Sequence, residues 1–115
     1  VVVVELGAND GLRGLAVAQT RANLDRIIRT AKGANAKVLL IGMRLPPNFG
    51  TQYTRAFEQT FVELSKQYQT AFLPFMLEPV AANRGNFQDD NMHPTAAAQP
   101  KLRDYVWTGL KPLLN

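Results

Sequence analysis

Three short apolar runs, separated by stretches of helical periodicity, constrain the fold of this chain more than any other feature. The runs are VVVVEL at 1–6, AKVLLIGM at 36–43 and TAFLPF at 70–75. A run that is apolar at successive positions is typical of a strand buried on both faces of a parallel sheet. Because such runs alternate with helical segments here, the sequence predicts an α/β domain with parallel strands.

Two amphipathic helices are predicted between these runs. The first covers about five turns and is expected to end near Gly33, and its apolar positions are Val17, Leu24, Ile27, Ile28 and Ala31. The second is expected from Thr51 to Tyr68, with one stripe formed by Tyr53, Phe57, Phe61, Leu64 and Tyr68.

A last helix is predicted after Pro94, with Thr95 as the candidate N-cap residue. Pro100 removes one helical hydrogen bond near the start, so we expect a kink or a late onset there. Leu102, Val106 and Leu110 supply the apolar face of this helix.

Length and composition exclude several classes of function. The 115 residues suffice for a single domain over 1–115, and the apolar runs are far shorter than a membrane span. The net charge of +4 comes from basic residues scattered along a predicted helix face, which indicates a solvated surface rather than a nucleic-acid site. The chain has no cysteine and one histidine without a cluster of carboxylates, so thiolate chemistry and a metal site are not expected.

The carboxyl ends of the predicted strands mark the expected ligand site. Right-handed crossovers place all three of these ends at one edge of the sheet, where ligands bind in open parallel sheets. Asn9, Arg44 and Met76 follow the three strands, and the long irregular stretch 76–92 begins at the same edge. The polar residues that are unusual in this sequence should therefore gather there.

His93 and Asp90 lie in FQDDNMHPTAAAQ, residues 87–99. A carboxylate on one ring nitrogen can orient a histidine that accepts a proton from a hydroxyl group, but the same pair can also serve only local order in a loop. Asn9, in GANDG at 7–11, has two interpretations as well. Its amide can donate to an oxyanion, or Asn9 or Asp10 can cap the following helix.

The nucleophile that would complete a triad is not evident. Ser65 is the only serine, and it lies inside a predicted amphipathic helix, whereas nucleophiles usually occupy exposed, strained turns. The stretch MRLPPNFGTQY, 43–53, contains Arg44 and two prolines, and it fits a rigid pocket wall and a simple connecting loop equally well.

Four stretches together resemble the SGNH (GDSL) hydrolases, especially the bacterial branch of thioesterase I, lysophospholipase and arylesterase enzymes. These stretches are VVVVELGANDGLRG, IGMRLPPNFGTQYTRAFEQTF, LPFMLEPV and DDNMHPTAAAQP, and they span nearly the whole chain in the order expected for the family. The resemblance implies a three-layer, flavodoxin-like α/β fold with a parallel sheet. That fold would be incomplete here, with three strands and about three helices.

The resemblance also implies a role for individual residues. Asn9 matches an oxyanion-hole donor, His93 the general base and Asp90 its orienting carboxylate. The residues expected at the substrate are Asp10, Arg44, Pro46 and Met92. The implied substrate is a small acyl ester or thioester, without cofactor, metal, nucleic acid or integral membrane segment, in a periplasmic or secreted bacterial setting.

One family feature is missing. The G-D-S block that carries the nucleophilic serine is not in the sequence, and the resemblance places it before Val1. We therefore expect the chain alone to lack turnover, and we expect residues 1–6 to pair with a second copy or with an N-terminal segment. The alternative is a non-catalytic α/β module that binds a ligand or a protein through the same loops.

Overall fold

The computed structural model describes residues 1–90 and 93–114, and three parallel strands form its sheet. Their order is β1-β2-β3, with Val3 opposite Leu39 and Leu39 opposite Ala71. The strands are β1 (Val2–Val4), β2 (Val38–Ile41) and β3 (Ala71–Leu73). The parallel α/β prediction is confirmed, although each strand is shorter than the apolar run that predicted it.

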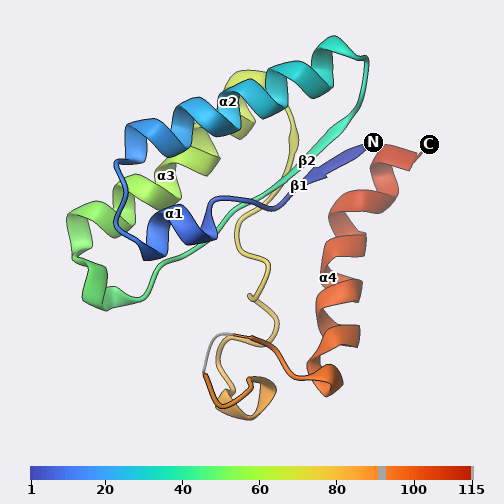
Figure 1. The fold of residues 1–115 in the computed structure, drawn as a ribbon. Helices are drawn as coiled ribbons and strands as arrows, with labels where there is room; N and C mark the ends of the chain where they lie inside the picture. The colour runs from blue at the N-terminus through green and yellow to red at the C-terminus, as the bar shows by residue number, and fades with distance from the viewer. Residues whose placement is uncertain (91–92, 115) are drawn as a thin grey trace.

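Helices cover the two faces of this sheet and produce three layers. The helices α2 (Val17–Gly33) and α3 (Thr51–Tyr68) lie on one side of the strands, and α4 (Gln99–Leu110) lies on the other (Figure 1). Side chains of β2 alternate between the two layers. Leu40 packs in the cluster that α2 and α3 share, whereas Leu39 and Ile41 pack against α4.

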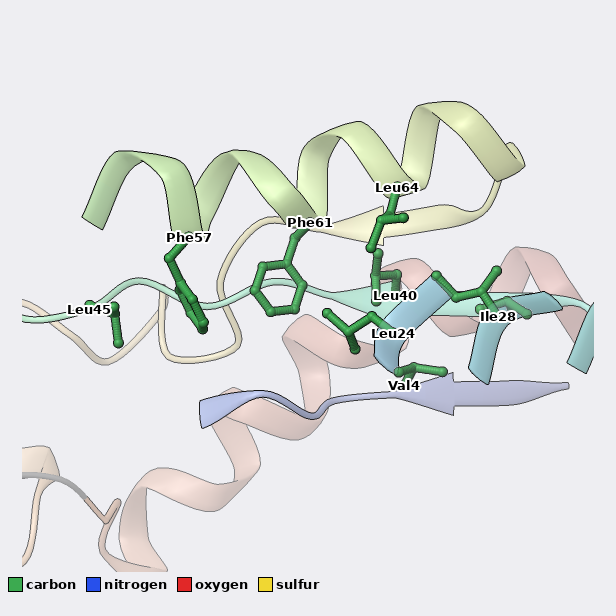
Figure 2. Close-up of a cluster of buried hydrophobic side chains, with 9 residues drawn as sticks. Val4, Leu24, Ile28, Leu40, Leu45, Phe57, Phe61 and Leu64 are labelled. Atoms are coloured by element: carbon green, nitrogen blue, oxygen red, sulfur yellow. The ribbon is translucent and has the colours of Figure 1, made fainter. Parts of the chain in front are cut away.

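The larger core cluster is built on the aromatic stripe of α3. Phe57, Phe61 and Leu64 are fully buried and point from α3 toward the sheet and α2 (Figure 2). The rings of Phe57 and Phe61 meet edge to face, with centroids 5.4 Å apart. The predicted stripe therefore forms the core, because residues at helical spacing share one face.

The helix ends differ in part from the prediction. α2 ends at Gly33, as expected, but its C-cap residue is Ala34, and Asn35 is the residue that adopts the left-handed conformation, with φ 63°. Thr95 is the N-cap residue of the 3-10 helix Ala96–Ala98 that leads into α4, as predicted, although its hydroxyl makes no capping hydrogen bond. The late onset is confirmed, since α4 begins at Gln99 with Pro100 in its first turn, where the missing N–H has no intrahelical acceptor to lose.

A short helix, α1 (Ala8–Leu12), follows the first strand, although the stretch GANDG at 7–11 has the composition of a turn. Gly7 precedes it with a φ of 106°, a backbone conformation that is unfavourable for residues with a Cβ atom. A Cβ atom on Gly11 would lie 2.7 Å from Leu45 Cδ2 and 2.8 Å from Phe57 Cζ. Because only glycine permits this approach, α1 lies directly on the core and its position is fixed.

A polar contact between α2 and α3 makes stability depend on pH. The Tyr68 hydroxyl donates a hydrogen bond to Asp25 Oδ1. That bond, aided by Arg29, lowers the pKa of the Asp25 carboxyl, and the same bond raises the pKa of Tyr68. A carboxyl whose pKa is lowered by folding stabilises the fold above its unfolded pKa, and this contribution disappears as the pH falls through its folded pKa.

We predict that Tyr68→Phe lowers the free energy of unfolding at pH 7. Because the contribution of Asp25 disappears in acid, the difference between wild type and Tyr68→Phe should shrink below about pH 4. Urea denaturation of both proteins at pH 7 and pH 3 measures this. A difference that stays constant between the two pH values would contradict the assignment.

Candidate active site

A pocket of about 330 Å³ lies at the carboxyl edge of the sheet. Its walls include Asn9 after β1, Met43 after β2 and Met76 after β3. His93 from the long loop also contributes to the polar part of the lining. The prediction that residues after the three strands gather at one site is therefore confirmed for Asn9 and Met76, whereas Met43, and not the predicted Arg44, lines the pocket after β2.

His93 and Asp90 form a closely tied pair. His93 Nδ1 lies 2.6 Å from Asp90 Oδ2, and the backbone N–H of His93 donates to Asp90 Oδ1 at 3.0 Å. With Nδ1 held by the carboxylate, Nε2 is the ring nitrogen that could exchange a proton with a substrate or nucleophile. The exposed fractions are 70% for the His93 side chain and 44% for that of Asp90, so the pair lies at the rim of the pocket.

Backbone hydrogen bonds fix the two sides of the loop that carries this pair. The N–H of Gln88 donates to the His93 carbonyl at 2.8 Å, and the N–H of Thr95 donates to the Asn86 carbonyl at 2.8 Å. Phe87 and Pro94 form an isolated antiparallel bridge between these bonds. His93 thus has an ordered backbone although it lies in an irregular segment.

Asn9 lies in α1 and contributes to the wall of the same pocket. Its side chain is exposed, and no cap of α1 uses it. Its backbone carbonyl accepts a hydrogen bond from the N–H of Arg13 at 3.0 Å. The capping interpretation of Asn9 was therefore wrong, and its amide group is available at the site.

Of the four residues predicted to contact substrate, the three that the structure describes lie outside the lining of the pocket that contains His93. Asp10 does not line the pocket of His93, and its carboxylate accepts a hydrogen bond from the buried Thr20 hydroxyl at 3.2 Å. Arg44 and Pro46 are exposed and lie outside its lining, next to Met43. Met92 falls outside the described residues.

The environment of Ser65 argues against a role as nucleophile. Only 8% of the residue is exposed, and its hydroxyl donates to the carbonyl of Val62 at 2.7 Å within α3. Ser65 does not contribute to the pocket that contains His93. It has the features of a helix serine that satisfies its hydrogen bond locally.

Two site residues were missed by the sequence reasoning. Glu5 lines the pocket of His93 and a neighbouring one that also contains Asp10, and desolvation there raises the pKa of the Glu5 carboxyl. Its place directly after a buried strand could have revealed it. Glu78 is the second; it lies outside the lining of this pocket but bonds to Arg44 at 2.8 Å, and nothing in the sequence indicates which charges on the two loops meet.

Neither a membrane-spanning helix nor a metal-binding group is found within residues 1–90 and 93–114. None of the helices there is long and apolar enough to cross a bilayer. The same residues contain no cluster of three or more histidine, aspartate or glutamate side chains that could hold a metal ion.

Curated relatives of this chain are bacterial esterases and thioesterases. It is 49% identical over 114 residues to "Esterase TesA" of Pseudomonas aeruginosa, covering 99% of this chain and 57% of that protein. It is 43% identical to "Thioesterase 1/protease 1/lysophospholipase L1" of Escherichia coli K12, covering 55% of that protein. The chain therefore spans little more than half the length of these relatives.

Solved structures show the same fold. The crystal structure of TesA matches with a TM-score of 0.92 over 98% of this chain and 63% of that one, at 49% identity. The psychrotrophic esterase EstA from Pseudoalteromonas, inhibited by monoethylphosphonate, also matches with a TM-score of 0.92, at 35% identity. The three layers described above are thus those of the SGNH hydrolase fold. The model of the GDSL-like Lipase/Acylhydrolase family matches residues 1–99, and the chain belongs to that family.

Proposed function

We propose that this chain carries the base and one oxyanion donor of a serine ester or thioester hydrolase. The observation that carries the proposal is the His93–Asp90 pair at 2.6 Å, at the rim of a pocket that Asn9 also lines. The names of the relatives, an esterase and a thioesterase, support acyl esters or thioesters as substrates. The nucleophilic serine is proposed to lie outside residues 1–115.

In the proposed mechanism, the serine oxygen attacks the acyl carbonyl while His93 Nε2 takes the hydroxyl proton. Asp90 holds the ring through Nδ1 and stabilises the imidazolium that forms. Asn9 donates its amide hydrogen to the negative oxygen of the tetrahedral intermediate. His93 then protonates the departing alcohol or thiol, and water repeats the sequence to release the acid. In this mechanism His93, Asp90 and Asn9 supply the proton transfers and one oxyanion contact, and no cofactor takes part.

The alternative is a non-catalytic module that binds a ligand through the same pocket. Labelling with a fluorophosphonate, which reacts with activated serines, separates the two functions. The full-length protein, meaning this chain together with the segment that would carry the serine, should be labelled if it is the proposed hydrolase. Its Ser65→Ala variant should be labelled equally, because the Ser65 hydroxyl is hydrogen-bonded to a carbonyl inside α3. Absence of label in the full-length protein would favour the binding module, and loss of label in Ser65→Ala would identify Ser65 as the nucleophile.

We predict that His93→Ala abolishes ester hydrolysis by the full-length protein, while Asp90→Ala reduces it less. The base transfers the proton, whereas the carboxylate only orients the base. Steady-state rates with p-nitrophenyl esters measure both effects. An active His93→Ala protein would exclude the assignment of His93.

For Asn9→Ala we predict a fall in kcat of roughly 10²–10³, the range found when one oxyanion donor is removed. The effect should be on kcat more than on KM, because the oxyanion exists only in the transition state. Asn9→Asp serves as a companion variant, since it keeps the size of the side chain and replaces the donor by an acceptor. A change confined to KM would show that Asn9 binds ground-state substrate or only shapes α1.

The edge of β1 is a further part of the proposal. In the described chain β1 pairs only with β2, and Val1, Val3 and Leu6 are 52%, 43% and 57% exposed. An exposed apolar strand edge is a template for pairing with another chain or segment. We propose that residues 1–6 pair with a second copy, an exchanged segment or an additional part of the protein.

For the isolated 115-residue chain, we therefore predict self-association through this edge. Native mass spectrometry should show oligomers, and hydrogen exchange should show protection at Val2–Val4 that increases with protein concentration. Val3→Lys, which adds a charge that disfavours edge pairing, should shift the equilibrium toward monomer. A wild-type chain that stays monomeric at high concentration, with fast exchange at Val2–Val4, would refute edge pairing.

A further inference from the structure

An ion pair joins the two loops that follow β2 and β3. Arg44 Nη1 lies 2.8 Å from Glu78 Oε2, across 34 positions of sequence. The guanidinium carbon of Arg44 also lies 5.2 Å from the ring centroid of Phe75, within the range of a cation–π contact. Arg44 therefore contacts both a carboxylate and an aromatic ring of the opposite loop.

These two loops are walls of the pocket that contains His93. Met43, directly before Arg44, lines it, and so do Phe75 and Leu77 on either side of Met76. Glu78 follows Leu77 directly. The ion pair thus joins residues that are next to the apolar lining in sequence, and it links the two neighbouring loops that contribute this part of the lining.

Both loops are already fixed at their bases. A Cβ on Gly42 would lie 2.5 Å from the Pro74 carbonyl oxygen, so the two backbones are in direct contact there. Leu45 is 6% exposed and packs against Gly11 of α1. The segment between Gly42 and Leu45 is therefore held at both ends, and Arg44 is the side chain that extends from it to the other loop.

We propose that Arg44 and Glu78 are positioning residues that hold Phe75 and the loop after β3 in the place where the pocket lining receives an aliphatic acyl chain. This rests on the proposed function, in which the acyl group of the substrate occupies the pocket. Exposed ion pairs add little to global stability, and these side chains are 48% and 51% exposed. Their effect is therefore expected on the binding of long acyl groups and not on folding.

The test compares p-nitrophenyl octanoate and p-nitrophenyl acetate as substrates of the full-length protein. Glu78→Gln should raise KM for the octanoate by roughly two- to five-fold, the range that corresponds to an exposed pair, with kcat nearly unchanged. The acetate buries little apolar surface and should be affected less. The double variant Arg44→Glu/Glu78→Arg exchanges the two charges and can form the ion pair again. Its KM for the octanoate should therefore return much of the way to the wild-type value.

Glu63→Gln is the matched control. It breaks an ion pair of similar exposure, Arg21–Glu63 at 3.0 Å, between α2 and α3 and away from the pocket lining. Its KM values should equal those of wild type. High salt, which screens exposed pairs, should raise the octanoate KM of wild type toward that of Glu78→Gln and change the variant less.

Binding of cis-parinaric acid, a fluorescent fatty acid, provides a second measurement that does not need turnover. Glu78→Gln should weaken this binding by a similar two- to five-fold factor. Equal octanoate KM and equal fatty-acid affinity in wild type and Glu78→Gln would overturn the proposal. A protein that hydrolyses neither ester but loses fatty-acid affinity on Glu78→Gln would refute the proposed hydrolysis and leave the role of the ion pair supported.

Discussion

Burial of β2 between two helical layers is the constraint on which the rest of the structure depends. All four residues of β2 are buried, and they alternate between the α2–α3 layer and α4. Burial of a strand on both faces removes more apolar surface from water than a strand with one solvated face could. The positions of the loops after β2 and β3, and so the walls of the pocket, follow from this central strand.

The same burial explains why much of the fold could be predicted from sequence. The run at 36–43 is apolar at nearly every position, and the stripe on α3 repeats at helical spacing, so both patterns have one physical interpretation. The short helix α1 was missed because GANDG has turn composition, and α1 packs on the core through the close approach of Gly11 to Leu45 and Phe57. A tertiary contact of that kind leaves no periodic signal in five residues.

The candidate site was predictable to a different extent for each residue. His93 and Asp90 are three positions apart, so their contact is local and could be inferred from a short motif. The Arg44–Glu78 pair joins residues 34 positions apart, and charges on two loops give no indication of which will meet. Asp10 illustrates the opposite case, because its bond to the buried Thr20 depends on how α2 packs beside α1.

The backbone bridge between Phe87 and Pro94 has a consequence for how the two parts of the proposed catalytic site respond to substitutions elsewhere in the chain. The bridge and the carboxylate of Asp90 give His93 its geometry from within a segment of about ten residues, largely independent of the sheet. The orientation of Asn9, by contrast, is inherited from the packing of Gly11 on the aromatic core. Substitutions in the core would therefore displace Asn9, the proposed oxyanion donor, before they disturb the contact between His93 and Asp90. The loop that carries His93 thus keeps its geometry through contacts within the loop itself, whereas the position of Asn9 depends on the packing of the whole core.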